Sequence, residues 1–254
     1  MTSTLRTSAP APPLTRVLAQ ARFETATLLR NGEQLLVSII LPLLALVLLT
    51  YAPFPDLEGD GPRINTIAPG VLALAVVSTA FTGQAISTGF DRRYGVLRLL
   101  GVTPLGRGGL LAGKAIAVLT VLGIQIVVLG AVALALGWRP ALAGLLPLLI
   151  SFILGALCFV SLALLLAGAL RAEAVLALAN LLWVIFLGMG LLLPLYVLGT
   201  IGGTIAAWLP SGMLGEAARL SSLEGTWPWW LWLALLAWTV IAGFLATRTF
   251  RWSD

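Results

Sequence analysis

The sequence predicts an all-α polytopic membrane protein with six transmembrane helices, and two observations carry that prediction. First, 59% of the 254 residues are hydrophobic and only 10% are charged, whereas soluble domains carry about 25% charged residues. Second, the apolar residues gather in six runs near the length of about 20 residues that a helix needs to cross a bilayer core. These runs are residues 35–52, 67–89, 110–136, 142–170, 175–198 and 229–247.

The distribution of basic residues predicts the orientation. If the N-terminus lies in the cytoplasm, only three of the 15 Lys and Arg residues fall outside, namely Arg63, Arg139 and Arg219. Such an excess of positive charge on the inner loops is the usual signature of membrane topology. We therefore expect a multi-pass protein with both termini in the cytoplasm. The tryptophans that this orientation places at the membrane boundaries are Trp138, Trp227, Trp229, Trp230, Trp232 and Trp252.

Two segments precede the first span. Residues 1–13 are polar and proline-rich, which predicts a disordered cytoplasmic lead, and residues 14–32 form an amphipathic pattern. A helix with such a pattern lies in the membrane interface, although a plain cytosolic helix remains an alternative. The six-helix membrane domain follows at residues 33–254. The side facing the membrane would carry Leu14, Leu18, Ala21, Thr25 and Leu28, and the opposite side Arg16, Gln20, Thr27 and Arg30.

The loop at residues 90–109 is the most charged internal segment. We expect a short helix over residues 91–100 that ends at Gly101, and a second helix that starts at Thr103 and Pro104, because a hydroxyl and a proline suit a helix start. Apolar side chains among the basic residues indicate a docking surface for another protein. Their packing on the membrane or on the bundle is an equal alternative. These side chains are Tyr94, Val96, Leu97, Leu99 and Leu100.

The end of this loop has nearly the spacing of a phosphate-binding P-loop. Gly108 is followed after four residues by Gly113 and Lys114. A P-loop follows a buried strand and continues with Ser or Thr after the lysine, but here Ala115 follows and a charged loop precedes. We therefore expect no nucleotide at this site. Lys114 is expected to extend its ammonium group to water at the cytoplasmic interface.

The chemistry available to the chain argues against an enzyme. The sequence has no histidine, a single cysteine, and no acidic residue within the apolar runs. We therefore expect no catalytic residues and no metal site. The same lack of acidic residues disfavours an ion-coupled transporter, although sodium binding by unwound backbone stays open. The scattered basic charges form no surface for nucleic acid.

Few polar side chains remain within the spans, and the most polar are Gln84, Gln125 and Asn180. They are candidates for a translocation path. Alternatively, these side chains form hydrogen bonds between helices, each worth on the order of 1 kcal/mol. This second interpretation is favoured. Such sparse polarity suits a large amphipathic or lipophilic substrate.

Three stretches resemble the bacterial type-2 family of ABC transporter permeases, the exporter-type membrane subunits with six helices. They are LLRNGEQLLVSIILPLLALVLL, IAPGVLALAVVSTAF and FDRRYGVLRLLGVTPLGRGGLLAGK. Many members have Glu at the position of Asp91, and the turn at Arg30 and Asn31 that leads to Pro42 is a second match. The most specific residues are Asp91, Arg92, Arg93, Gly95, Leu99, Thr103, Pro104, Gly113 and Lys114.

The resemblance implies a complex of two permease subunits, either a homodimer or a related heterodimer, with two separate ATPase subunits. ATP and Mg²⁺ would bind to the ATPase, and this chain would bind no cofactor. Residues 14–32 would be the connecting helix, and the loop at residues 90–109 would carry a coupling helix that sits in a cleft of the ATPase. The coupling residues would be Asp91, Arg92, Arg93, Tyr94, Gly95, Leu97, Leu99, Leu100, Thr103 and Pro104.

The resemblance also implies re-entrant helices at residues 199–228 that close the path on the outside. Gly202 and Gly203 would allow a tight reversal there, and with Pro210 they would form the outer gate. An ordinary surface loop is the alternative. The implied activity is export of a drug, lipid, glycolipid or haem-like molecule across the bacterial cytoplasmic membrane. An ATP-independent transporter or channel is the second hypothesis, and a membrane anchor that only assembles other proteins is the third.

Overall fold

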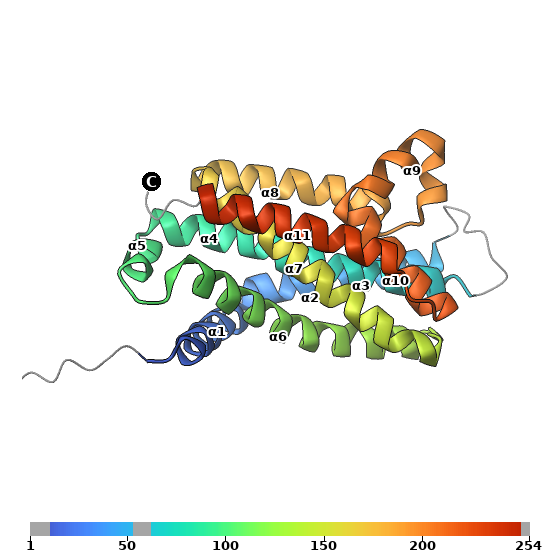
Figure 1. Cartoon of the computed structure of the whole chain (residues 1–254). Helices are drawn as coiled ribbons and strands as arrows, with labels where there is room; N and C mark the ends of the chain where they lie inside the picture. Colours follow the sequence, from blue (N-terminus) through green and yellow to red (C-terminus); the bar gives the residue numbers. More distant parts are fainter. Residues whose placement is uncertain (1–10, 53–61, 250–254) are drawn as a thin grey trace, which may run out of the picture.

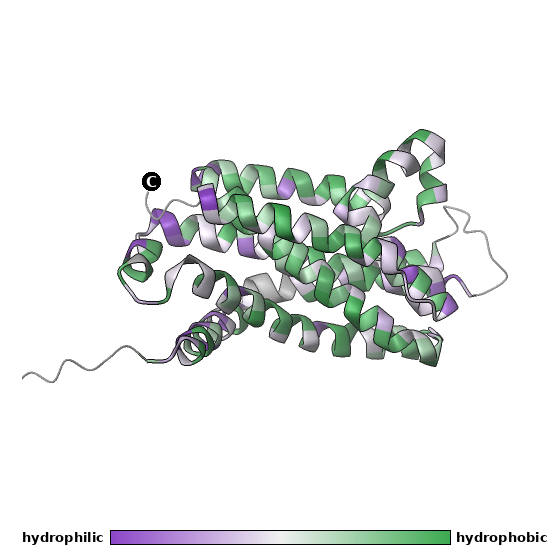
Figure 2. Cartoon of the chain, viewed as in Figure 1, coloured by the Kyte–Doolittle hydropathy of each residue, from purple (hydrophilic) through white to green (hydrophobic). Residues whose placement is uncertain are grey.

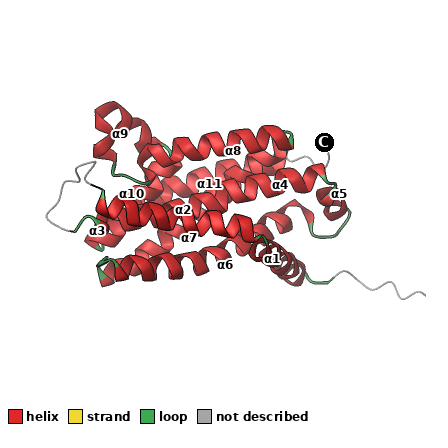
Figure 3. Ribbon diagram, turned by 180° about the vertical axis from the view of Figure 1, so that it is seen from behind, coloured by secondary structure: helices red, strands yellow, loops and turns green. Residues whose placement is uncertain are grey.

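The computed structural model describes residues 11–52 and 62–249 and has no strand within them, which confirms the all-α prediction. Most helices run along one direction, and α1 crosses them near one end of the bundle (Figures 1 and 3). The short helix α5 lies at that same end, called here the α5 end, and α9 lies at the opposite end, called the α9 end. Most of the predicted lead at residues 1–13, and Trp252, fall outside the described residues.

The helices follow one another with short connections. Two π-helical turns, η1 (Ser78–Gly83) and η3 (Leu187–Leu191), and two 3₁₀ turns, η2 (Leu142–Gly144) and η4 (Leu195–Leu198), lie between them. The α-helices are α1 (Pro13–Arg30), α2 (Gly32–Tyr51), α3 (Ile64–Val77), α4 (Gln84–Arg93), α5 (Val96–Gly101), α6 (Gly106–Ala135), α7 (Leu145–Ala169), α8 (Ala172–Phe186), α9 (Gly199–Trp208), α10 (Pro210–Glu224) and α11 (Trp229–Thr249).

Five helical stretches of the described chain are long and apolar enough to cross a membrane. In α2, the shorter stretch Ser38–Tyr51 is apolar, and this helix packs along α3. Figure 2 shows apolar residues along the middle of the bundle and hydrophilic residues mainly toward its two ends. The protein is therefore a multi-pass membrane protein. The five stretches are Ile64–Arg93, Gly108–Ala135, Leu142–Ala169, Ala172–Leu191 and Trp229–Thr249.

The span formed by α3, η1 and α4 is the centre of the bundle. Every residue from Ile67 to Val77 is buried, because the alanines and the glycine in this stretch let neighbouring helices approach closely. Below it, Phe81 of η1 meets Phe159 of α7 and Phe186 of α8 edge to face, with ring centroids 6.2 and 5.4 Å away. This arrangement is the favoured geometry for aromatic pairs. The three rings therefore connect three spans.

The fifth span is shorter than predicted. The apolar run extends to residue 198, but the helix leaves its regular path at Met189 (φ −102°, ψ 70°) and Gly190 (φ +78°) and the span ends at Leu191. Hydropathy follows side chains and does not detect this backbone break. A residue other than glycine would be strained at the positive φ of Gly190.

At the α9 end, α9 and α10 form a bent pair with an angle of 101° between them. The reversal occurs at Leu209, whose backbone is extended (φ −85°, ψ 144°), and α10 begins at Pro210. The prediction that Gly202 and Gly203 make the reversal is wrong, because both lie inside α9. Gly203 instead allows close packing, since a Cβ atom there would lie 2.7 Å from the backbone oxygen of Leu195. The segment is helical and not an ordinary surface loop.

Arg219 of α10 supports the broken end of the fifth span. Its side chain is buried, with 3% of the residue exposed. Nη2 donates to the backbone oxygen of Gly190 at 2.7 Å, and Nη1 donates to that of Leu191 at 3.3 Å. Both oxygens sit where the helix ends and no longer accept the regular intrahelical bonds. Arg219 therefore supplies hydrogen bonds to a buried piece of irregular backbone.

We predict that Arg219→Met destabilises the protein by about 3 kcal/mol, because it removes both donors from buried backbone oxygens and leaves Glu216 without its cation. The measurement is the midpoint of unfolding of the detergent-solubilised protein. Arg139→Met is the matched control, since Arg139 is an exposed arginine. Equal midpoints for the two variants would contradict the role assigned to Arg219.

Candidate functional site

The loop between the second and third predicted spans is built differently from the expectation. Helix α4 continues without a break to Arg93, and the chain then turns at Gly95, which has φ +76°. The separate helix α5 begins at Val96. The predicted single helix over residues 91–100 is therefore wrong. A left-handed backbone at position 95 is favourable only for glycine, which is why the helix divides there.

The second predicted helix start in this loop is also wrong. The Thr103 hydroxyl donates to the backbone oxygen of Leu100 at 2.6 Å and so closes the preceding turn. Helix α6 begins only at Gly106, and no side chain caps it. The backbone oxygen of Pro104 accepts a hydrogen bond from the Arg16 guanidinium of α1. The turn between α5 and α6 is therefore in contact with α1.

Three large apolar side chains of the loop are exposed: Tyr94 (73%), Leu99 (70%) and Val102 (85%). Together with the exposed Arg98 they form what we call the loop surface. Leu97, which we expected to be exposed as well, is fully buried and belongs to the main hydrophobic core. Helix α5 lies against the bundle, so that its Leu97 side is covered and its Leu99 side is open.

Two arginines of α4 have different environments. Arg92 is buried, and its guanidinium donates to the backbone oxygens of Ala167 and Leu170 at the end of α7. A cation at a helix C-terminus is favourable because carbonyl groups there lack intrahelical donors. Arg93 is exposed and forms an ion pair with Glu173 of α8. Arg92 therefore connects α4 to the end of α7 inside the bundle and is not part of the loop surface.

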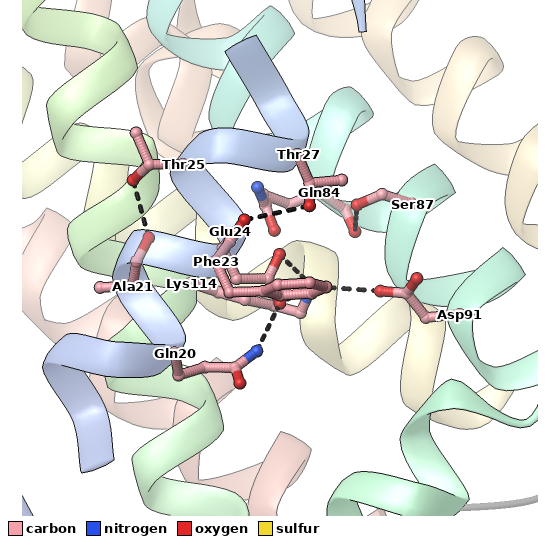
Figure 4. Close-up of polar contacts among 10 residues, drawn as sticks. All are labelled: Gln20, Ala21, Phe23, Glu24, Thr25, Thr27, Gln84, Ser87, Asp91 and Lys114. Atoms are coloured by element: carbon pink, nitrogen blue, oxygen red, sulfur yellow. Dashed lines mark hydrogen bonds and ion pairs between the residues drawn. The ribbon is translucent and has the colours of Figure 1, made fainter. Parts of the chain in front are cut away.

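Lys114 does not reach water, contrary to the prediction. Its side chain is fully buried, and Nζ lies 2.9 Å from Oε1 of Glu24 and 3.4 Å from Oδ2 of Asp91. Gln20 donates to Glu24 from one helical turn earlier, at 2.9 Å. We call these four residues the Lys114 cluster, which joins α1, α4 and α6 (Figure 4). The snorkelling prediction fails because α1 covers the lysine.

Helix α1 packs on α6 through a face that coincides only in part with the predicted apolar side, at Ala21 and Leu28. Its buried residues are Gln20, Ala21, Glu24 and Leu28, whereas Leu14 and Leu18 are exposed by 68% and 50%. Gly113 makes the close approach possible, because a Cβ atom there would lie 2.8 Å from Cγ of Gln20. The sequence signal that we missed is the four-residue spacing of Gln20 and Glu24 beside Ala21.

The polar residues within the spans have separate environments. Gln125 of α6 is fully buried; it donates to Oγ of Ser38 and accepts from Oγ1 of Thr79, both at 2.9 Å. It therefore connects helices, as the favoured interpretation predicted. Gln84 is fully buried, and neither atom of its amide has a hydrogen-bond partner within the described part of the chain. Asn180 of α8 is exposed and donates to the Leu176 backbone oxygen of its own helix.

A pocket of about 580 Å³ lies between α2, η1, α4 and α8. Its volume is in the range of small-molecule sites, about 300–1,000 Å³. Of the three predicted path residues, only Asn180 lines it. Thr82 lines it with a buried hydroxyl that has no partner within the described residues, and none of the lining side chains that the structure describes is charged. The lining residues are Asn31, Ser38, Leu41, Ser78, Thr82, Gly83, Ile86, Phe90, Asn180 and Trp183.

Comparison with known proteins identifies the family. The model of the ABC-2 type transporter family matches residues 15–219. The matched region includes most of α1, the loop between α4 and α6, and most of α10. A search of curated proteins returned no match. Because the family model covers more than half of the chain, this protein belongs to the ABC-2 type transporter family and is a permease subunit of an ABC-type transporter.

Proposed function

We propose that this permease exports an amphipathic or lipophilic molecule, driven by ATP hydrolysis on two copies of a separate ATPase subunit. A second permease subunit, identical or related, would complete the complex. In this arrangement the α5 end and both termini lie in the cytoplasm, and ATP and Mg²⁺ bind to the ATPase alone. The observation that carries the proposal is the loop surface formed by Tyr94, Arg98, Leu99 and Val102 at the α5 end.

The loop surface is suited to contact a protein partner. Three large apolar side chains are exposed there beside the basic Arg98. Apolar patches on a segment that faces solvent commonly mark sites of interaction with other proteins. The segment is also firmly attached, because Leu97 is buried in the core and Arg16 of α1 bonds to Pro104. A force that the ATPase applies to Leu99 would therefore reach the bundle.

The pocket between α2, η1, α4 and α8 is the proposed part of the translocation path that this subunit contributes. The lining side chains that the structure describes are hydroxyl, amide, aliphatic and aromatic groups without charge, which suits a neutral or amphipathic molecule. Apolar side chains on α2 and α8, two of the helices that line the pocket, are exposed, including Leu48 (66%) and Val184 (57%). A second permease subunit would cover them. At the α9 end, Gly202, Gly203 and Pro210 would belong to the outer gate.

We predict that Leu99→Asp weakens binding of the ATPase, because it places a charge in the centre of an apolar contact. The expected loss is about 2 kcal/mol, roughly 30-fold in affinity. Co-purification of the ATPase with the tagged permease measures it. The matched control is Leu142→Asp, at a leucine of η2 that is 85% exposed and outside the loop surface. Unchanged co-purification for Leu99→Asp would overturn the assignment of the loop surface.

Arg92 is not a useful position for this test. Charge reversal there removes the donors to Ala167 and Leu170 and places a carboxylate beside two backbone oxygens. We expect the folded protein to be lost with Arg92→Glu. Arg93→Glu is expected to fold, since Arg93 is exposed.

We predict that Ile86→Trp reduces transport by filling the pocket, while the ATPase still co-purifies. Ile86 lines the pocket from α4. Ile124→Trp is the matched control, because Ile124 is 45% exposed on α6 and is not among the lining residues. Transport by reconstituted complex, followed with a panel of lipophilic fluorescent dyes, is the measurement. Dye transport by the permease without any ATPase would instead favour the ATP-independent transporter.

A further inference from the structure

The Lys114 cluster closes the base of the loop that carries the loop surface. Asp91 lies at the start of the loop at residues 90–109, and Lys114 lies shortly after its end. The two residues are 23 positions apart in the chain, yet their charged groups lie 3.4 Å apart. The segment between them, including α5 and the loop surface, starts and ends at this closed base. We propose that Lys114 is a positioning residue that makes α1, the end of α4, α5 and the start of α6 move as one rigid body.

The first support is the burial of the charges. The Lys114 side chain is fully buried, and that of Glu24 is 9% exposed. Separating Lys114 from Glu24 would leave a buried carboxylate without its cation, which is strongly unfavourable. Exposed ion pairs, in contrast, contribute little to stability and break readily. The pair of Arg93 and Glu173, exposed by 48% and 65%, is of that weaker kind. The Lys114 cluster is thus the stronger ionic connection at the α5 end.

The second support is the number of independent contacts that hold α1. Near its start, Arg16 bonds to the Pro104 oxygen in the turn that follows α5. In its middle, Glu24 accepts from Lys114 of α6 and from Gln20 of its own helix. Between these two points the Gln20 side chain of α1 packs directly on Gly113 of α6, where a Cβ atom would lie 2.8 Å from Cγ of Gln20. Helix α1 therefore spans the loop from its turn to its base.

A consequence for the mechanism follows, which rests on the proposed function. A displacement of α5 by the ATPase would reach α4 and α6 together at Lys114 and would carry α1 along. Helix α4 also lines the pocket with Ile86 and Phe90. The cluster would therefore transmit the displacement to the pocket instead of letting the loop bend. A small displacement of one helix is passed to its neighbours in this way when the packed contacts between them cannot deform.

The experiment separates this role from simple stabilisation. Lys114→Met alone leaves Glu24 buried without its cation, so we expect a lower midpoint of unfolding. Adding Glu24→Gln removes the uncompensated charge, and the midpoint should recover, because neutral replacement of a buried ion pair is often tolerated. Asp91, with a side chain 33% exposed, keeps access to water. The double variant is therefore folded but lacks the buried ion pair.

The readout is the distance between spin labels at Thr27→Cys on α1 and Val96→Cys on α5, in a Cys158→Ala background. Thr27 is exposed, and Val96 is partly exposed and lies outside the loop surface. In the wild-type complex we expect one narrow distance, unchanged on trapping with ATP, Mg²⁺ and vanadate. In the Lys114→Met/Glu24→Gln variant we expect a second distance or a broader distribution. A label pair within α6, at Thr120→Cys and Leu134→Cys, should stay unchanged in both proteins.

Two outcomes would overturn the proposal. One is a distribution in the double variant as narrow as in the wild type, and the other is a wild-type distance that shifts on trapping. A failure of the proposed function looks different. If no ATPase bound to the wild-type permease, nucleotide and vanadate would have no effect on any label pair. The comparison of wild type and double variant without nucleotide would still decide whether Lys114 holds α1 against the loop.

Discussion

The structure depends on one constraint: a polar group inside a membrane bundle is costly unless it finds a partner within the protein, because hydrocarbon offers none. The irregular places of the fold are where this constraint is visible. Arg219 donates to the oxygens at the broken end of the fifth span, and Arg92 donates to those at the end of α7. Gln125 satisfies two hydroxyl groups of neighbouring helices. Each of these side chains lets the backbone depart from a regular helix, or lets two helices meet, without an unpaired group.

The same constraint gives the two ends of the bundle different properties. At the α9 end, the bent pair α9 and α10 is attached through backbone contacts made possible by small residues, as at Gly203, and by Arg219. At the α5 end, the connection is ionic and runs through Lys114 to Glu24 and Asp91. Packed glycine contacts hold the elements close, whereas a buried ion pair resists separation. The α9 end suits a segment that closes a path, and the α5 end suits a segment that transmits force.

Helix α4 is the physical connection between the proposed partner site and the proposed path. On one side Ile86 and Phe90 line the pocket, and on another Asp91 faces Lys114. At its end, Gly95 changes the direction of the chain into α5 and the loop surface. Because α4 carries the pocket residues and Asp91 and leads directly into the turn at Gly95, we expect a movement of its end to reach both the pocket and the loop. The described side chains that line the pocket are uncharged, which agrees with an uncharged or amphipathic substrate.

Composition and hydropathy alone predicted the all-α membrane fold and most of the spans, because the length of an apolar helix is set by the bilayer and is local in the chain. The sequence also indicated the loop at residues 90–109 as a docking segment, since it is the most charged internal segment of an otherwise apolar chain. Tertiary structure decided which of its side chains are exposed to a partner protein. Leu97 is buried and Leu99 is exposed, although both are leucines of the short helix α5. Tertiary structure also decided that Lys114 is buried in an ion pair, because its partner Glu24 lies 90 positions earlier in the chain. No local pattern contains that contact, because it exists only when α1 folds back over α6 and excludes water from the ammonium group.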